Sequence, residues 1–182
     1  MEHNIEVELR GLMAEEAFRA LETRLKKEGV KCEEDDKDTY FFNVQKGTFK
    51  ISDEKSRNQA KICLKVGDLE TSALREVDLK IARTEVPAAI KLLVALGYEK
   101  YHLVPQKRAN YFLPGAILSL KYTPDFQFHF EMESENLVDE KDIESEKAKL
   151  RKLCAEYGIV PMDPEEIAEH MKMIRKKIGF DA

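Results

Sequence analysis

Residues 5–10 read Ile-Glu-Val-Glu-Leu-Arg, and apolar and charged side chains alternate along the whole stretch. Alternation with a period of two is typical of a β-strand whose two faces meet different surroundings. Residues 128–133, near the other end of the chain, read Phe-His-Phe-Glu-Met-Glu and repeat the pattern. The charged faces of these two predicted strands hold Glu6, Glu8, Arg10, His129, Glu131 and Glu133.

The rest of the chain predicts an alternation of strands and helices. Period-two patterns give eight strands in all, at 5–10, 39–42, 48–52, 60–66, 74–81, 101–112, 116–122 and 126–134. Apolar stripes at helical spacing, bounded by Gly or Pro, predict helices at 14–28, 86–96, 140–157 and 164–178. Because most links between strands are short, we expect antiparallel pairing. The polar stretches 33–36 and 53–58 are expected to be connections, and Pro105 is a candidate break in its strand.

Composition excludes several classes of protein. A length of 182 residues fits one domain, and a net charge of −5 argues against broad nucleic-acid binding. No apolar run approaches the roughly 20 residues that span a bilayer, and the chain enters a strand pattern at once, so we expect no signal peptide. Three cysteines without a CxxC motif argue against disulfides and structural zinc, which favours a cytoplasmic location.

The charged strand faces have two interpretations. They could be the solvated outer face of a sheet, or they could line the inside of a closed sheet. In the second case the glutamates meet basic residues on the other predicted strands, namely Lys50, Lys61, Lys65, Lys80, Arg108 and Lys121. Carboxylate oxygens suit Mg²⁺ or Mn²⁺, and lysine and arginine suit phosphates. The second interpretation therefore predicts a site for a divalent metal and a polyanion.

At this point the sequence resembles the CYTH proteins, the triphosphate tunnel family, which includes class IV adenylyl cyclases, thiamine triphosphatases and inorganic triphosphatases. The stretch 5–10 is similar to the family's ExExK signature. Further similar segments follow in the family's order over almost the whole chain, at Asp38-Thr39-Tyr40-Phe41, Phe49-Lys50-Ile51, Leu64-Lys65-Val66-Gly67, Arg75-Glu76-Val77-Asp78, Leu96-Gly97-Tyr98, Lys107-Arg108, Phe130-Glu131-Met132-Glu133 and Tyr157-Gly158-Ile159.

The resemblance implies an α+β fold, an eight-stranded antiparallel closed β-barrel with flanking helices and a C-terminal helical tail. It implies a single domain over 1–182, with the barrel at about 4–135 and the C-terminal helices at about 140–180. The implied metal ligands, for Mg²⁺ or Mn²⁺, are Glu6, Glu8, Glu131 and Glu133. The implied substrate-binding residues are Lys50, Lys65, Lys80, Arg108 and Lys121. Arg10 and Lys65 are the implied catalytic residues.

The implied reaction is metal-dependent hydrolysis of a triphosphate, with tripolyphosphate, ATP or thiamine triphosphate as substrate. Two alternatives stay open, a class IV adenylyl cyclase that makes cyclic AMP and pyrophosphate, and a polyphosphate- or nucleotide-binding module without turnover. Arg10 replaces the signature lysine, and Gln106 and Ser52 replace basic residues of some members. Lys121 falls where cyclase-like members often carry Asp, which favours hydrolysis. No nucleic-acid or membrane partner is expected, and a homodimer is compatible with the sequence.

Overall fold

The charged strands close into a ring. In the computed structural model, which describes residues 5–45, 47–66 and 73–180, nine strands form one continuous sheet. The strands are β1 (Ile5–Leu12), β2 (Cys32–Glu34), β3 (Lys37–Phe42), β4 (Thr48–Glu54), β5 (Gln59–Val66), β6 (Ala73–Ile81), β7 (Tyr101–Leu113), β8 (Ala116–Thr123) and β9 (Gln127–Ser134). Their order is β2-β7-β3-β4-β5-β6-β1-β9-β8, and pairing of β7 with β8 closes the barrel. Every pairing is antiparallel, as predicted.

The strands β2 and β3 together form one wall of the barrel. Cys32 pairs with Tyr111 and Lys37 with Gln106, so both strands follow one continuous register along β7. Asp35 and Asp36 interrupt the pairing between them. The barrel is therefore eight-stranded, as predicted. The prediction of a connection over 33–36 was partly wrong, because Glu33 and Glu34 pair with β7 although they are charged.

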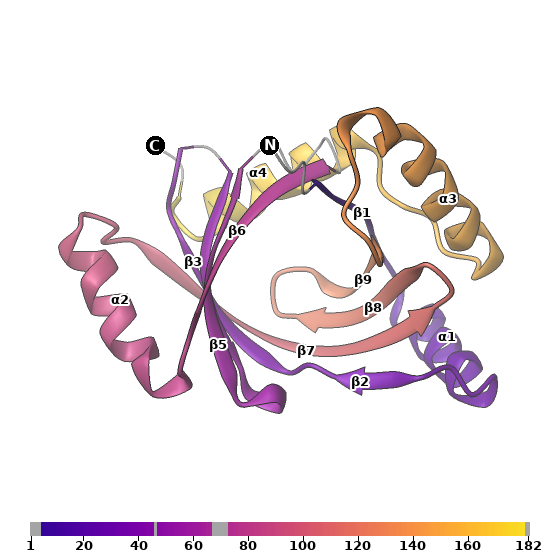
Figure 1. The fold of residues 1–182 in the computed structure, drawn as a ribbon, viewed down its shortest axis with the longest axis horizontal. Coiled ribbons are helices and arrows are strands. Elements are labelled where there is room, and N and C mark those ends of the chain that lie inside the picture. Colours follow the sequence, from indigo (N-terminus) through magenta and orange to yellow (C-terminus); the bar gives the residue numbers. More distant parts are fainter. Residues whose placement is uncertain (1–4, 46, 67–72, 181–182) are drawn as a thin grey trace.

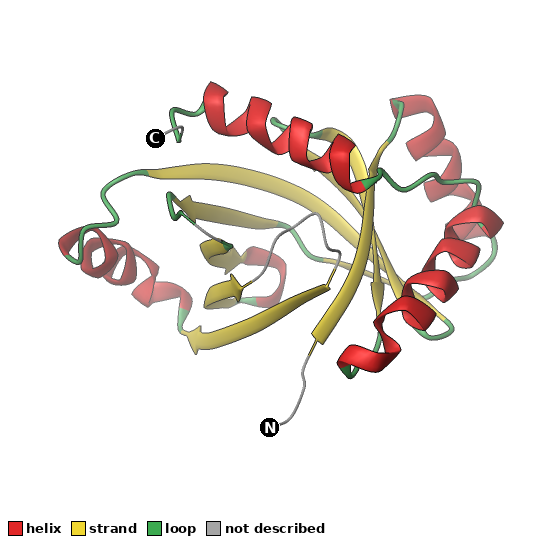
Figure 2. Ribbon diagram, turned by 90° about the horizontal axis from the view of Figure 1, so that it is seen from above, coloured by secondary structure: helices red, strands yellow, loops and turns green. Residues whose placement is uncertain are grey.

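Within the described residues, four α-helices pack around the barrel, at α1 (Glu15–Lys27), α2 (Val86–Ala95), α3 (Ile143–Glu156) and α4 (Pro164–Lys177). Short 3₁₀ turns lie at Lys55–Arg57 (η1), Arg83–Glu85 (η3) and Glu140–Asp142 (η4). The helix α2 flanks one side, and α1 and α3 lie on the opposite side (Figure 1). Figure 2 shows α4 running across the strands near the C-terminus. Among these described helices, none is long and apolar enough to cross a membrane.

The apolar core lies outside the barrel, between the strands and the helices. On β1, Ile5, Val7 and Leu9 are buried against a cluster that includes side chains of α1 and α3. A second cluster packs Phe42 and Ile51 of the barrel against Val86 and Leu93 of α2. Because strand side chains alternate, the polar residues between these apolar ones face inward. The fold class predicted from the sequence is confirmed.

Two local expectations changed. Pro105 does not break its strand, because β7 pairs with β8 only from Lys107 onward. Pro105 thus lies where β7 has β3 as its paired neighbour, and a missing N–H is tolerated there. Asn4, the predicted start of the barrel, and Gly67, which closes one family-like segment, lie outside the described residues.

The segment between α3 and α4 crosses β1 at Gly11. The backbone N–H of Met162 donates to the carbonyl of Arg10 at 2.9 Å. A Cβ on Gly11 would lie 2.5 Å from both the Phe130 ring and the Val160 carbonyl oxygen. Glycine is needed here because the tail and the Phe130 ring approach the β1 backbone from close range.

We expect Gly11→Ala to lower the free energy of unfolding by about 1–3 kcal/mol, since the added methyl group overpacks this crossing. Urea unfolding of the purified protein measures the effect. The control is Leu12→Ala at the next position, where the leucine is 43% exposed and little packing is lost. Equal stability of Gly11→Ala and wild type would contradict the close packing of the tail on β1.

Candidate functional site

The barrel encloses a charged cavity of about 540 Å³. Side chains from all eight barrel walls line it, and several carry charges that are almost completely shielded from solvent. Glu8 is 3% exposed, Lys121 is 5% exposed and Lys65 is 8% exposed. The interpretation of these residues as a solvated outer face is wrong, because closure of the sheet turns them inward.

The four predicted metal ligands lie on two adjacent strands. Glu6 and Glu8 are on β1, and Glu131 and Glu133 are on β9. In the register of these strands Glu8 is opposite Glu133, and Arg10 is opposite Glu131. All four glutamates line the cavity. The alternation of β1 and β9, together with their antiparallel pairing, therefore brings the carboxylates together on one stretch of the inner wall.

Cations from the predicted set hold three of these carboxylates. The ammonium of Lys65 contacts Glu6 and lies 3.6 Å from a carboxylate oxygen of Glu8. Arg10 forms an ion pair with Glu8, and Lys121 forms one with Glu131. Burial alone would raise the pKa of Glu131, but the neighbouring Lys121 brings that pKa well below its ordinary value. Internal ion pairs thus satisfy much of the buried charge.

Glu133 is in a different state from the other three glutamates. Its carboxylate lies 4.0 Å from the guanidinium of Arg108, a longer separation than in the other pairs. Burial and the neighbouring Glu6 carboxylate raise the pKa of Glu133 to about 7. Adjacent carboxylates with incomplete cationic compensation, all offering hard oxygen donors, fit a Mg²⁺ or Mn²⁺ ion.

The predicted basic residues divide into two groups. Lys50, Lys65, Arg108 and Lys121 line the cavity. Burial and the neighbouring Lys65 ammonium lower the pKa of Lys50. Lys80 is exposed at the end of β6 and is absent from the cavity lining that the described residues form. The structure thus brings four of the five predicted substrate-binding residues together, and it leaves Lys80 outside the group.

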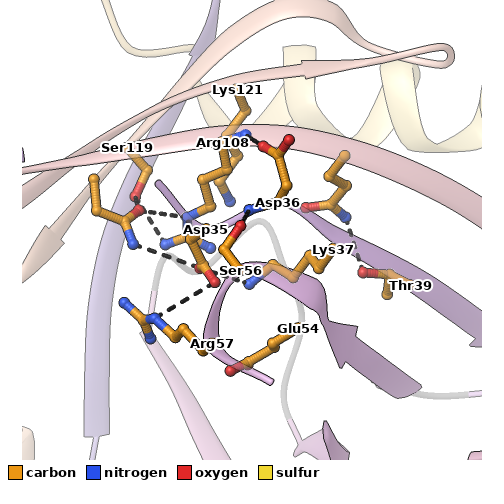
Figure 3. Close-up of polar contacts among 12 residues, drawn as sticks. Asp35, Asp36, Lys37, Thr39, Glu54, Ser56, Arg57, Arg108, Ser119 and Lys121 are labelled. Atoms are coloured by element: carbon orange, nitrogen blue, oxygen red, sulfur yellow. Dashed lines mark hydrogen bonds and ion pairs between the residues drawn. The ribbon is translucent and has the colours of Figure 1, made fainter. Parts of the chain in front are cut away.

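Sequence reasoning missed a polar cluster at the interruption between β2 and β3 (Figure 3). Asp35 is 3% exposed there, and one of its carboxylate oxygens lies 3.1 Å from the ammonium of Lys37. Arg57, in the turn η1, and Arg108, in β7, also approach this carboxylate. Lys37 and Arg57 line the cavity. Their segments look like polar connections in the sequence, so no strand alternation marked these side chains as inward-facing.

A second group of possible metal ligands lies on β5 and β6. Donor atoms of Cys63, Glu76 and Asp78 all lie within 4.8 Å of one another. Lys61 already contacts both carboxylates, and burial raises the pKa of the Cys63 thiol to about 12. A protonated thiol is a poor metal ligand. These contacts argue against a metal site at Cys63, which is fully buried in the wall.

The helix α4 gives the cavity an apolar section. Met171, Ile174 and Ile178 line it from outside the barrel, as does Arg175, whose guanidinium bonds Asn43 at 3.1 Å. The ring of Phe126, at the turn before β9, stacks on His170 of α4 with centroids 4.6 Å apart. The cavity therefore combines a charged wall with apolar surface that could contact an organic group.

No family model and no curated protein matches the sequence, but solved structures share the fold. A protein from Pyrococcus horikoshii OT3 has a TM-score of 0.71 at 15% identity, over 85% of this chain and 91% of that chain. A candidate adenylate cyclase from Vibrio parahaemolyticus has a TM-score of 0.66 at 14% identity, over 91% and 93%. A candidate adenylyl cyclase from Hippeastrum, described as having a dominant triphosphatase activity, has a TM-score of 0.58 at 18% identity, over 87% and 89%. The chain therefore has the tunnel fold of the CYTH proteins, as the order of its motifs predicted.

Proposed function

We propose that the protein hydrolyses a triphosphate with the help of a divalent metal ion bound inside the barrel. The observation that carries this proposal is the shared cavity, in which carboxylates of β1 and β9 face lysines and arginines of β4, β5, β7 and β8. A triphosphate is a flexible polyanion, and its hydrolysis depends mainly on positioning and on neutralising charge. The buried cations of the tunnel supply both.

The predicted ligands of a Mg²⁺ or Mn²⁺ ion are Glu6, Glu8, Glu131 and Glu133. When bound there, the metal would polarise a phosphoryl oxygen and lower the pKa of a coordinated water. The chain's own contribution is to hold the phosphates. Arg108 donates from Nε to Asn110 at 2.6 Å and from Nη2 to Ser119 at 2.8 Å, which fixes its guanidinium in the wall. A fixed guanidinium binds phosphate oxygens with little loss of conformational entropy.

Lys121 bears on the choice between hydrolysis and cyclisation. Its ammonium contacts Glu131, which favours the charged form, and a charged lysine neutralises phosphate but cannot accept a proton from a ribose hydroxyl. Hydrolysis is therefore the first candidate. Burial and the neighbouring Arg108, however, lower the pKa of Lys121 well below its ordinary value. A neutral lysine could accept such a proton, and this observation supports the adenylyl cyclase as the second candidate.

The products of ATP turnover discriminate among the candidates. With Mn²⁺ we expect inorganic phosphate to exceed cyclic AMP, and we expect Lys121→Asp to weaken triphosphate binding because it reverses a buried charge. Analysis of the products formed from tripolyphosphate, thiamine triphosphate and ATP shows which reaction the protein catalyses. The matched control is Lys107→Asp, the same charge reversal at an exposed neighbouring position. Dominant cyclic AMP would establish the cyclase instead, and binding without either product would establish a binding module.

Lys65 tests the phosphate-binding wall. We expect Lys65→Ala to weaken triphosphate binding by roughly 1.5–3 kcal/mol, the range of a charge-assisted hydrogen bond. Calorimetric titration with tripolyphosphate measures the change. Lys80→Ala removes the same charge from an exposed position, so it should leave the affinity within about twofold of wild type. Equal losses in the two variants would show that Lys65 acts only through long-range electrostatics and does not contact the phosphates.

The pH dependence of stability in the metal-free protein tests whether Glu133 lies among the clustered carboxylates. Its pKa is raised to about 7 from 4.5, so the folded protein binds more protons than the unfolded chain between these values. The stability contribution of Glu133 is therefore lost as the pH rises from 4.5 to 7. Glutamine does not titrate, so the stability of Glu133→Gln relative to wild type should increase by roughly 2 kcal/mol between pH 5 and pH 8.

Urea unfolding with a chelator at the two pH values measures this difference. Glu135→Gln is the control, because Glu135 follows the same strand in an exposed position. A Glu133→Gln difference that does not change with pH would show that Glu133 is not held among uncompensated carboxylates.

A further inference from the structure

The interruption between β2 and β3 is an organised structure. The carboxylate of Asp36 accepts a hydrogen bond from the backbone N–H of Arg108 at 3.1 Å. The backbone N–H of Asp36 donates to the hydroxyl of Ser56 at 2.9 Å, and the Ser56 N–H donates back to the Asp36 carbonyl at 3.3 Å. These bonds join the turn η1 to the barrel wall. They fix the position from which Arg57 extends into the cavity.

Three cations gather at this place around one carboxylate. Lys37 lies 3.1 Å from Asp35, and both Arg57 and Arg108 lie 3.6 Å from it. The oxygen that faces Arg57 has no hydrogen-bond partner among the described residues, although it is buried. Figure 3 shows the side chains of Lys37, Arg57 and Arg108 converging on Asp35 from β3, η1 and β7.

Carboxylates accompany these cations. Asp36 accepts a hydrogen bond from the Arg108 backbone, and Glu54, opposite Lys37 in the register of β3 and β4, is buried and lines the cavity. Besides Asp35, the described contacts of Arg57 include Glu33, at 3.6 Å, whose side chain is 43% exposed. Burial and the neighbouring Arg108 lower the pKa of Lys37 to about 8, as expected where cations crowd together. Like charges held at short range in a shielded place are a common feature of anion-binding sites.

Arg108 connects this cluster with the proposed metal ligands. Its Nε lies 3.6 Å from Asp35, while its Nη2 lies 4.0 Å from Glu133. One guanidinium thus lies between the carboxylates of β9 and the cations around Asp35. A phosphate chain that contacts Arg108 beside Glu133 can continue along the cavity wall towards Lys37 and Arg57.

We propose that Lys37, Arg57 and Arg108 form an anion site, with Asp35 as the counter-ion that positions them. The site binds the phosphate group at the end of the triphosphate that lies farther from the metal glutamates. This inference rests on the proposed function, because it assigns part of the same triphosphate to a place in the tunnel. Arg57 is the entrance residue of the site, since its side chain is 37% exposed. Lys37, which is buried, and Arg108, whose side chain is 14% exposed, form its floor.

The test is calorimetric titration of the full chain with tripolyphosphate, with a chelator present so that no turnover occurs. We expect Arg57→Gln to weaken binding at least fivefold and Arg57→Lys to recover part of the loss. Lys55→Gln removes the same charge from the same turn, but Lys55 pairs with Asp38 and lies outside the cavity lining formed by the described residues. This control should change the affinity by less than twofold. Inorganic phosphate alone should bind at least tenfold more weakly than tripolyphosphate.

The inference is overturned if Arg57→Gln behaves like Lys55→Gln, if wild type binds no tripolyphosphate, or if phosphate and tripolyphosphate bind equally well. Hydrolysis with Mn²⁺, measured on the same wild-type sample, separates the two proposals. If wild type hydrolyses the substrate and Arg57→Gln binds tripolyphosphate as tightly as wild type, the anion site is refuted and the proposed function stands. If Arg57→Gln loses fivefold in affinity but wild type does not hydrolyse the substrate, the anion site stands and the proposed function is refuted.

Discussion

The tunnel depends on the pairing of charges that barrel closure removes from water. Moving an unpaired carboxylate or ammonium into a shielded interior is strongly unfavourable, so a barrel filled with charges folds only if most of them meet a partner. Lys65 illustrates the solution, because its ammonium lies close to Glu6, Glu8 and Glu76 at once. The apolar residues that would fill an ordinary small barrel instead face outward against the helices. The helices therefore stabilise the fold, and the interior is left free for polar chemistry.

Because apolar side chains face outward and charged ones inward, the strands were easy to predict, but the site was only partly predictable. Strict alternation at residues 5–10 and 128–133 determines which side chains share a face. It cannot by itself say whether that face meets bulk water or the inside of a ring, since closure depends on the pairing of β7 with β8. The order of family-like motifs supplied the missing information. Residues that sit on regular strands, such as Glu8 and Arg108, were accordingly found in the cavity.

Prediction from the sequence failed where position along a strand, or an irregular backbone, decides whether a side chain lines the cavity. Lys80 alternates correctly, yet it lies one residue before the end of β6 and is exposed. Lys37 and Arg57, by contrast, line the cavity although the sequence did not predict it. The kink at Asp35 and Asp36 and the turn η1 direct them inward, although their segments resemble solvated connections. Such side chains are placed by hydrogen bonds between distant segments, for example Asp36 with Arg108, and no local pattern encodes these bonds.

The internal pairing also constrains how a ligand can bind. Several cations of this tunnel are already paired with carboxylates, since Arg10 contacts Glu8, and Lys121 contacts Glu131. Under the proposed function, a metal ion on the glutamates would neutralise those partners and release the lysines and arginines towards phosphate oxygens. A bound triphosphate would likewise release the glutamates towards the metal. Each ligand then strengthens the binding of the other by the same factor, as thermodynamic linkage requires. The ion pairs that stabilise the tunnel would thus also couple the two ligands of the proposed function.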